Sequence, residues 1–136
     1  MNILQPPGWA RPKGFSHGIA ASGRHVAIAG QIGCDAEGRV LEKTFAGQFR
    51  QTLKNIVAVL AEAGGRPEHI VRLTWYVLDL KEYTAALRDI GAAYRDVIGK
   101  HYPAMAVVQV SGLVDPGARL EIEAAAVIPK RQAEQP

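Results

Sequence analysis

The chain has 136 residues and a mass of 14.6 kDa, which is the size of one ordinary domain. Hydrophobic residues make up 48% of it and charged residues 21%, which excludes a wholly disordered, collagen-like or coiled-coil chain. The formal net charge is +3, and the basic residues are scattered instead of forming a block that could follow a phosphate backbone. Nucleic acid is therefore disfavoured as a partner.

Several sequence features that would indicate a membrane, a disulfide, a metal or a cofactor are absent. No apolar run approaches the roughly 20 residues that cross a bilayer, and no basic segment followed by an apolar one opens the chain. We therefore expect a cytoplasmic protein without a membrane partner. The single cysteine, Cys34, excludes an internal disulfide, and we interpret it as a structural or loop thiol. The four histidines stand at no metal-ligand spacing, and no phosphate-binding motif is present, so we expect neither metal nor cofactor.

The two ends of the chain differ from the rest. Residues 1–14 contain three of the eight prolines, and we interpret them as an irregular arm. Residues 129–136 are polar and are expected to fray. Nothing between these ends resembles a linker or a repeat, so we predict a single domain over residues 1–136.

The first half of this domain is predicted as strand and then helix. A short strand is expected over residues 25–30, and turn residues at 35–39 separate it from an extended piece at 40–41. From Phe45 to Leu60 apolar residues recur every three or four positions, which predicts an amphipathic helix that ends at Gly64.

The second half continues with strand, helix and two strands. Residues 70–80 predict a strand whose apolar face carries Val71, Leu73, Trp75 and Val77. A helical period covers residues 83–98, and strands are expected over 106–111 and 120–128. This order predicts an α+β fold with two helices on one face of a mixed sheet. The other face is half apolar, which favours assembly with further copies of the chain.

Two carboxylates stand out as candidates for chemistry. Glu121 and Glu123 share one face of the last strand, about 7 Å apart at strand rise. A carboxylate on a partly buried sheet face can have a raised pKa and transfer protons. The alternative is that both form ion pairs with Arg72, which shares their face by alternation, or with an arginine of another subunit.

Four segments in order resemble the Rid (YjgF/RidA, L-PSP) family over about residues 15–127. The segments are Ala29-Gly30-Gln31-Ile32; Gln51-Thr52-Leu53-Lys54-Asn55-Ile56; Ile70-Val71-Arg72 with Val77-Leu78-Asp79-Leu80; and Tyr102-Pro103-Ala104 followed by Val107-Val108-Gln109-Val110 and Leu120-Glu121-Ile122-Glu123-Ala124. The resemblance implies a chorismate-mutase-like fold, a homotrimeric barrel and small-ligand sites in the clefts between subunits. It also implies cofactor-free deamination of enamines and imines such as 2-aminoacrylate.

The ligand cleft departs from the family pattern. Met105 stands where the deaminating members have the arginine that binds the substrate carboxylate, and methionine has neither charge nor donors. Phe15, Ala29 and Val107 replace a tyrosine, a serine and a cysteine of the family's cleft. The chain retains Gly30, the Pro103-Ala104 turn, and Glu121, which matches the glutamate that positions water.

Two functions stay open from the sequence. In the first, the protein is an imine or enamine hydrolase that uses Glu121 as its catalytic residue and takes a less acidic substrate. In the second, the cleft binds a small apolar or aromatic metabolite without chemistry, as a sensor or accessory protein. Endoribonuclease activity is a weaker third hypothesis. Should an anion bind, Arg72 is the first cation to consider.

Overall fold

The computed structural model describes residues 1–130. The elements in chain order are β1 (Asn2–Leu4), β2 (Gly18–Ala20), β3 (Arg24–Gln31), α1 (Phe45–Glu62), the 3₁₀ turn η1 (Pro67–His69), β4 (Ile70–Val77), α2 (Leu80–Ala85), α3 (Leu87–Val97), β5 (Ala104–Gln109) and β6 (Leu120–Ile128). The mixed α+β architecture expected from the sequence is confirmed.

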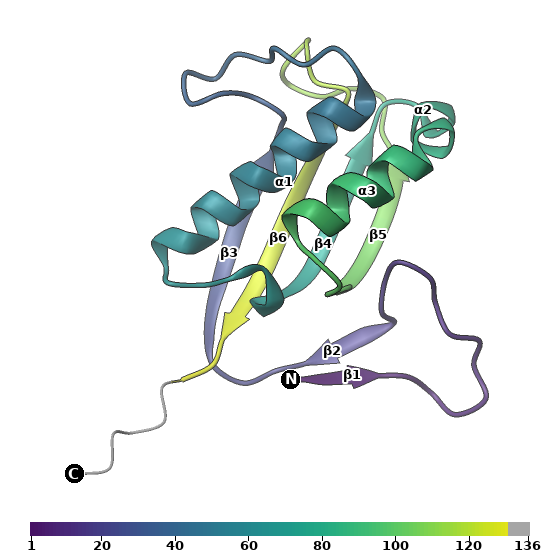
Figure 1. Cartoon of the computed structure of the whole chain (residues 1–136), viewed down its shortest axis with the longest axis vertical. Coiled ribbons are helices and arrows are strands. Elements are labelled where there is room, and N and C mark those ends of the chain that lie inside the picture. Colours follow the sequence, from purple (N-terminus) through teal and green to yellow (C-terminus); the bar gives the residue numbers. More distant parts are fainter. Residues whose placement is uncertain (131–136) are drawn as a thin grey trace.

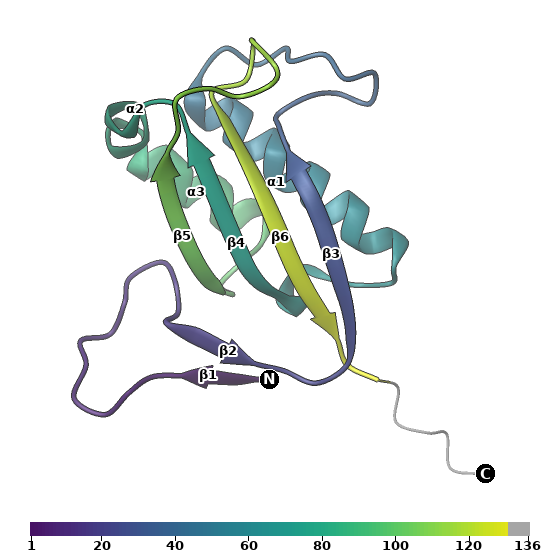
Figure 2. The ribbon, with the colours of Figure 1, turned by 180° about the vertical axis from the view of Figure 1, so that it is seen from behind.

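Four strands form one sheet in the order β3-β6-β4-β5, in which β4 and β5 are parallel and the other pairs antiparallel. Helices α1 and α3 cover one face of this sheet (Figure 1). The opposite face, seen in Figure 2, carries no helix from residues 1–130. We call it the open face.

Helix α1 begins and ends where its sequence signals lie. The hydroxyl of Thr44 accepts a hydrogen bond from the Gly47 N–H at 3.0 Å, which caps the first turn. At the other end Gly64 has a φ of +80°, a conformation that glycine adopts without steric cost. The face between these ends packs on the sheet: Phe49, Leu53, Ile56 and Leu60 are completely buried.

The predicted second helix is two helices. The Asp79 side chain accepts from the Lys81 N–H at 2.8 Å, so α2 begins at Leu80, directly after the strand and before the expected position 83. Ala86, with φ −99° and ψ 7°, then separates α2 from α3. An alanine gives no sequence signal for such a break, because it is the best helix former.

Two strand expectations also change. A register shift between Ile70 and Arg72 places Ile70, and not Val71, in the core at 0% exposure. The extended piece at 40–41 is a single bridge between Cys34 and Val40.

The arm expected to be irregular contains β1, which pairs antiparallel with β2 and forms a hairpin beyond the end of the main sheet (Figure 2). At the other end, Pro129 and Lys130 follow β6 without regular structure. The remainder of the predicted frayed tail, 131–136, lies outside the described residues.

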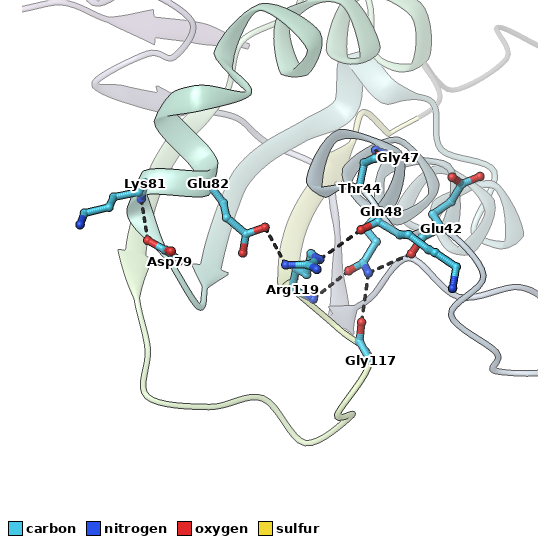
Figure 3. A network of polar contacts seen from close by, with 10 residues as sticks. Glu42, Thr44, Gly47, Gln48, Asp79, Lys81, Glu82, Gly117 and Arg119 are labelled. Carbon is cyan, nitrogen blue, oxygen red and sulfur yellow. Dashed lines mark hydrogen bonds and ion pairs between the residues drawn. The ribbon is translucent and has the colours of Figure 1, made fainter.

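A buried amide joins α1 to the loop before β6 (Figure 3). The Gln48 side chain is 2% exposed; its Nε2 donates to the carbonyls of Glu42 at 3.1 Å and Gly117 at 3.0 Å. Its Oε1 accepts from the Arg119 N–H at 2.8 Å. The Arg119 guanidinium in turn pairs with Glu82 of α2 at 2.8 Å. This network fixes the start of β6, two residues before Glu121.

We expect Gln48→Leu to lower the free energy of unfolding by about 2 to 3 kcal/mol, because it leaves buried backbone groups without partners. Gln51→Leu on the same helix is the matched control, since the Gln51 side chain donates to Asn55 Oδ1 on the helix surface and is only partly buried. Urea denaturation of both variants at one protein concentration measures the difference. Equal losses would show that the buried network contributes nothing specific.

Candidate active site

The N-terminal segment is fastened to the start of β5. The Ser16 hydroxyl donates to the Tyr102 carbonyl at 2.6 Å, and the Ser16 N–H donates to the Pro103 carbonyl at 3.0 Å. Ser16 is 7% exposed, and it forms a parallel bridge with Ala104. These contacts hold the neighbouring Phe15 beside the first residues of β5.

The turn before β5 is fixed from α3 and β4. The Tyr94 hydroxyl donates to the His101 carbonyl at 2.6 Å, and the Tyr94 ring stacks on Tyr102 with centroids 5.3 Å apart. Burial raises the pKa of Tyr94 well above its ordinary value, so its hydroxyl stays protonated. His101 Nε2 lies 2.6 Å from the Ile70 carbonyl. Pro103, which is fully buried, therefore enters β5 from a rigid turn.

A cavity of about 480 Å³ opens between α3 and β5. Met105 and Val107 pair with Leu73 and Trp75 in the sheet register, so both point to the helix-covered face. The main lining residues of this cavity, which we call the α3 pocket, are Phe15, Trp75, Tyr83, Leu87, Met105 and Val107. Burial raises the pKa of Tyr83, so its hydroxyl stays protonated at neutral pH.

Glu121 lies elsewhere, on the open face. It pairs in register with Tyr76 and lines a shallow hollow with Glu123 and the loop 110–114. Its carboxylate packs against the backbone of Gly30: a Cβ on residue 30 would lie 2.8 Å from Glu121 Cδ and closer still to Oε2. Only glycine fits there without displacing the carboxylate. Ala29, next to it, is exposed.

The residues singled out from the sequence therefore form two groups. Phe15, Met105 and Val107 meet in the α3 pocket, close to the Pro103-Ala104 turn. Gly30 and Glu121 lie on the open face, and the exposed Ala29 precedes Gly30 in β3. Within one chain the sheet separates the groups, so one subunit alone does not bring Met105 and Glu121 to one ligand.

The expected ion pair of Arg72 is not formed within residues 1–130, where it contacts neither glutamate as an ion pair. Arg72 is exposed. Glu123 instead accepts a hydrogen bond from the Tyr76 hydroxyl, and this bond raises the pKa of Tyr76. The alternation placed Arg72 correctly, but Tyr76 is the neighbour that reaches the carboxylate.

Part of the site carries no clear sequence signal. Lys13, Tyr83, Leu87, Gly91 and Arg95 also border the α3 pocket. Tyr83 and Leu87 follow the helical period in the same way as core-facing residues. The sequence therefore gives no sign that they border a cavity. In residues 1–130 no three metal-binding side chains cluster, and no helix there is long and apolar enough to span a membrane.

Comparison with known proteins decides the family. The sequence profile described as endoribonuclease L-PSP matches residues 9–128. The chain belongs to the endoribonuclease L-PSP (Rid) family.

Relatives agree with this Rid assignment along most of the chain. A RutC family protein of Aquifex aeolicus is 34% identical over 93% of this chain and 99% of its own length. The human protein named 2-iminobutanoate/2-iminopropanoate deaminase is 31% identical over 76% of this chain and 73% of its own. The crystal structure of YyfB, a Rid protein of unknown function from Yersinia pestis, superposes with a TM-score of 0.81 at 32% identity, covering 93% of this chain and 98% of that one.

Proposed function

We propose that the protein is a cofactor-free imine or enamine hydrolase whose sites lie in the clefts between the subunits of a homotrimer. The observation that carries this is the packing of the Glu121 carboxylate on the backbone of Gly30, at a face open to a partner. A human relative that carries the name of a 2-imino acid deaminase supports the reaction class.

The separation of the two groups of site residues supports the proposed trimer. A cyclic assembly can place the α3 pocket of one subunit against the open face of the next, so that each cleft contains both groups. The open face is suited to such burial, because Val108 and Tyr76, register partners on it, present apolar surface, and Val108 is 42% exposed. Light scattering should give a mass about three times 14.6 kDa; a monomer at micromolar concentration would contradict the assembly.

The proposed catalytic role of Glu121 is proton transfer. Its carboxylate accepts a proton from water as the water oxygen bonds to the imine carbon, and that proton then passes to the nitrogen. The hydroxyl proton of the resulting carbinolamine then passes through the same carboxylate to the nitrogen as the carbon–nitrogen bond breaks, which releases ammonia and leaves a ketone. The packing against Gly30 holds the carboxylate in one place for both transfers.

The substrate differs from a small 2-imino acid, because Met105 offers no charge to a carboxylate at its position. A bidentate arginine contact contributes about 1.5 to 3 kcal/mol, so losing it lowers affinity roughly 10- to 100-fold. We therefore expect weak or no acceleration of 2-aminoacrylate hydrolysis. We expect the protein to hydrolyse imines with larger apolar groups faster than they hydrolyse in buffer without protein.

An amino-acid oxidase that generates a series of imines, coupled to detection of free ammonia, tests both expectations. Met105→Arg is the matched variant, and it is expected to improve the use of 2-aminoacrylate at least tenfold relative to the wild type. If neither the wild type nor Met105→Arg accelerates the hydrolysis of any imine, the hydrolase proposal is rejected and non-catalytic ligand binding is favoured. Cleavage of RNA by the pure protein would instead favour endoribonuclease activity, which is the activity in the description of the family profile.

A further inference from the structure

The α3 pocket contains two cations that no acidic residue neutralises within residues 1–130. Arg39, Arg50, Arg66 and Arg119 all form ion pairs with carboxylates. Lys13 and Arg95, which line the pocket, form none among the described residues.

The Arg95 guanidinium lies beside Gly91, one helical turn before it. A Cβ on residue 91 would lie 3.3 Å from Arg95 Nη1, so the guanidinium lies over the bare backbone of Gly91. Gly91 is itself part of the pocket wall, and the charge therefore borders the cavity. A cation beside an apolar cavity attracts an anion more strongly than a cation in bulk water does.

The body of the cavity suits a flat ring. Trp75 stacks on Phe49 with centroids 4.7 Å apart and meets the edge of Tyr83 at 86°. Trp75 and Tyr83, with Met105 and Val107, give an aromatic and polarisable wall, and sulfur–aromatic contacts are favourable. The volume of about 480 Å³ is far more than a three-carbon acid fills.

One polar atom of this wall lacks a partner. Trp75 Nε1 is buried and makes no hydrogen bond with any of residues 1–130. An unpaired buried donor is unfavourable, and a small shift of the Trp75 ring that exposed Nε1 to the cavity would let a ligand oxygen accept from it. The pocket therefore differs from a filled hydrophobic core.

We propose that the α3 pocket binds aromatic carboxylates, with the ring between Met105 and the Trp75 wall and the carboxylate at Arg95 and Lys13. The proposal rests on the proposed function for the reaction and deepens it by naming the ligand class. The anion-binding charge of the site comes from α3 and the N-terminal segment, in place of residue 105 on β5. An arylalkyl 2-imino acid is then the substrate class, and an aromatic 2-keto acid the product.

Direct binding tests this without turnover. Phenylpyruvate is titrated into the full chain by calorimetry, and in a Trp9→Phe background the fluorescence of Trp75 reports on the pocket. Trp9 is 60% exposed and is the other of the two tryptophans. We expect saturable binding of phenylpyruvate with a change in Trp75 emission, and at least tenfold weaker binding of both pyruvate and phenylacetone, which lacks the carboxylate.

Arg95→Gln is expected to weaken phenylpyruvate binding about tenfold and to leave phenylacetone binding unchanged. Arg88→Gln is the matched control, because Arg88 is on the same helix, is exposed and does not line the pocket. Equal effects of the two variants, or equal affinity for phenylpyruvate and phenylacetone, would overturn the proposal.

The proposed ligand class and the proposed hydrolase reaction can be rejected independently of each other. If imines of small amino acids were hydrolysed while phenylpyruvate did not bind, the ligand class would be wrong and the hydrolase function would stand. Binding of phenylpyruvate without hydrolysis of any imine would instead reject the hydrolase function and support the ligand class.

Discussion

Phe49→Ala should lower the free energy of unfolding by about 3 to 5 kcal/mol, because it removes a fully buried ring from the interface between α1 and the sheet. Phe49 stacks on Trp75, so the cavity left behind adjoins the wall of the α3 pocket. The same variant is therefore expected to weaken ligand binding in that pocket at temperatures where it remains folded.

Val59→Ala on the same helix is the control, since Val59 is 42% exposed and should change the free energy of unfolding by less than about 0.5 kcal/mol. Urea denaturation at one protein concentration measures both variants, because the stability of an oligomer depends on concentration. A loss below about 1 kcal/mol for Phe49→Ala would mean that the packing of α1 on Trp75 is not central to the fold.

Glu121→Gln is expected to reduce the turnover of the best imine substrate by a factor of about 100 to 10,000, because the amide cannot accept the proton from water. The amide is close in size to the carboxylate, so the contact with Gly30 and the fold should be retained. KM should change little, since the ligand-binding groups of the α3 pocket are untouched.

Glu123→Gln is the matched control on the same strand and face. Glu123 already accepts the Tyr76 hydroxyl and is exposed, so its loss should change turnover by less than about threefold. A fall in turnover of the same size for both variants would remove the assignment of Glu121 as the catalytic residue.

Much of the fold was predictable, because its long elements have strong periods. The apolar recurrence from Phe45 to Leu60 and the alternation in β6 located α1 and the two faces of the last strand correctly. The break at Ala86 was not predictable, since the helical period runs through an alanine without interruption. Strand β1 was missed because its three residues precede two prolines and its pairing with β2 depends on contacts far along the chain.

The candidate site was predictable only as a set of residues. Alternation placed Glu121 on one face, but the apolar strand β5 gave no sign that Met105 turns to the other face. That assignment depends on the parallel register of β5 with β4, which only the tertiary structure sets. The cations Lys13 and Arg95 were missed for the same reason, because they come from a loop and a helix that meet β5 in three dimensions.

Each site, as proposed, combines the α3 pocket of one subunit with Glu121 of another. Mixing two inactive variants tests this most directly: Glu121→Gln, and Leu87→Trp, which fills the pocket from a half-exposed position on α3. The two variants are unfolded and refolded together, and each alone as a control. Random mixing in a cyclic trimer then predicts recovery of about a quarter of the wild-type imine hydrolysis. No recovery, in mixtures shown by mass spectrometry to contain hybrid trimers, would contradict a site shared between subunits.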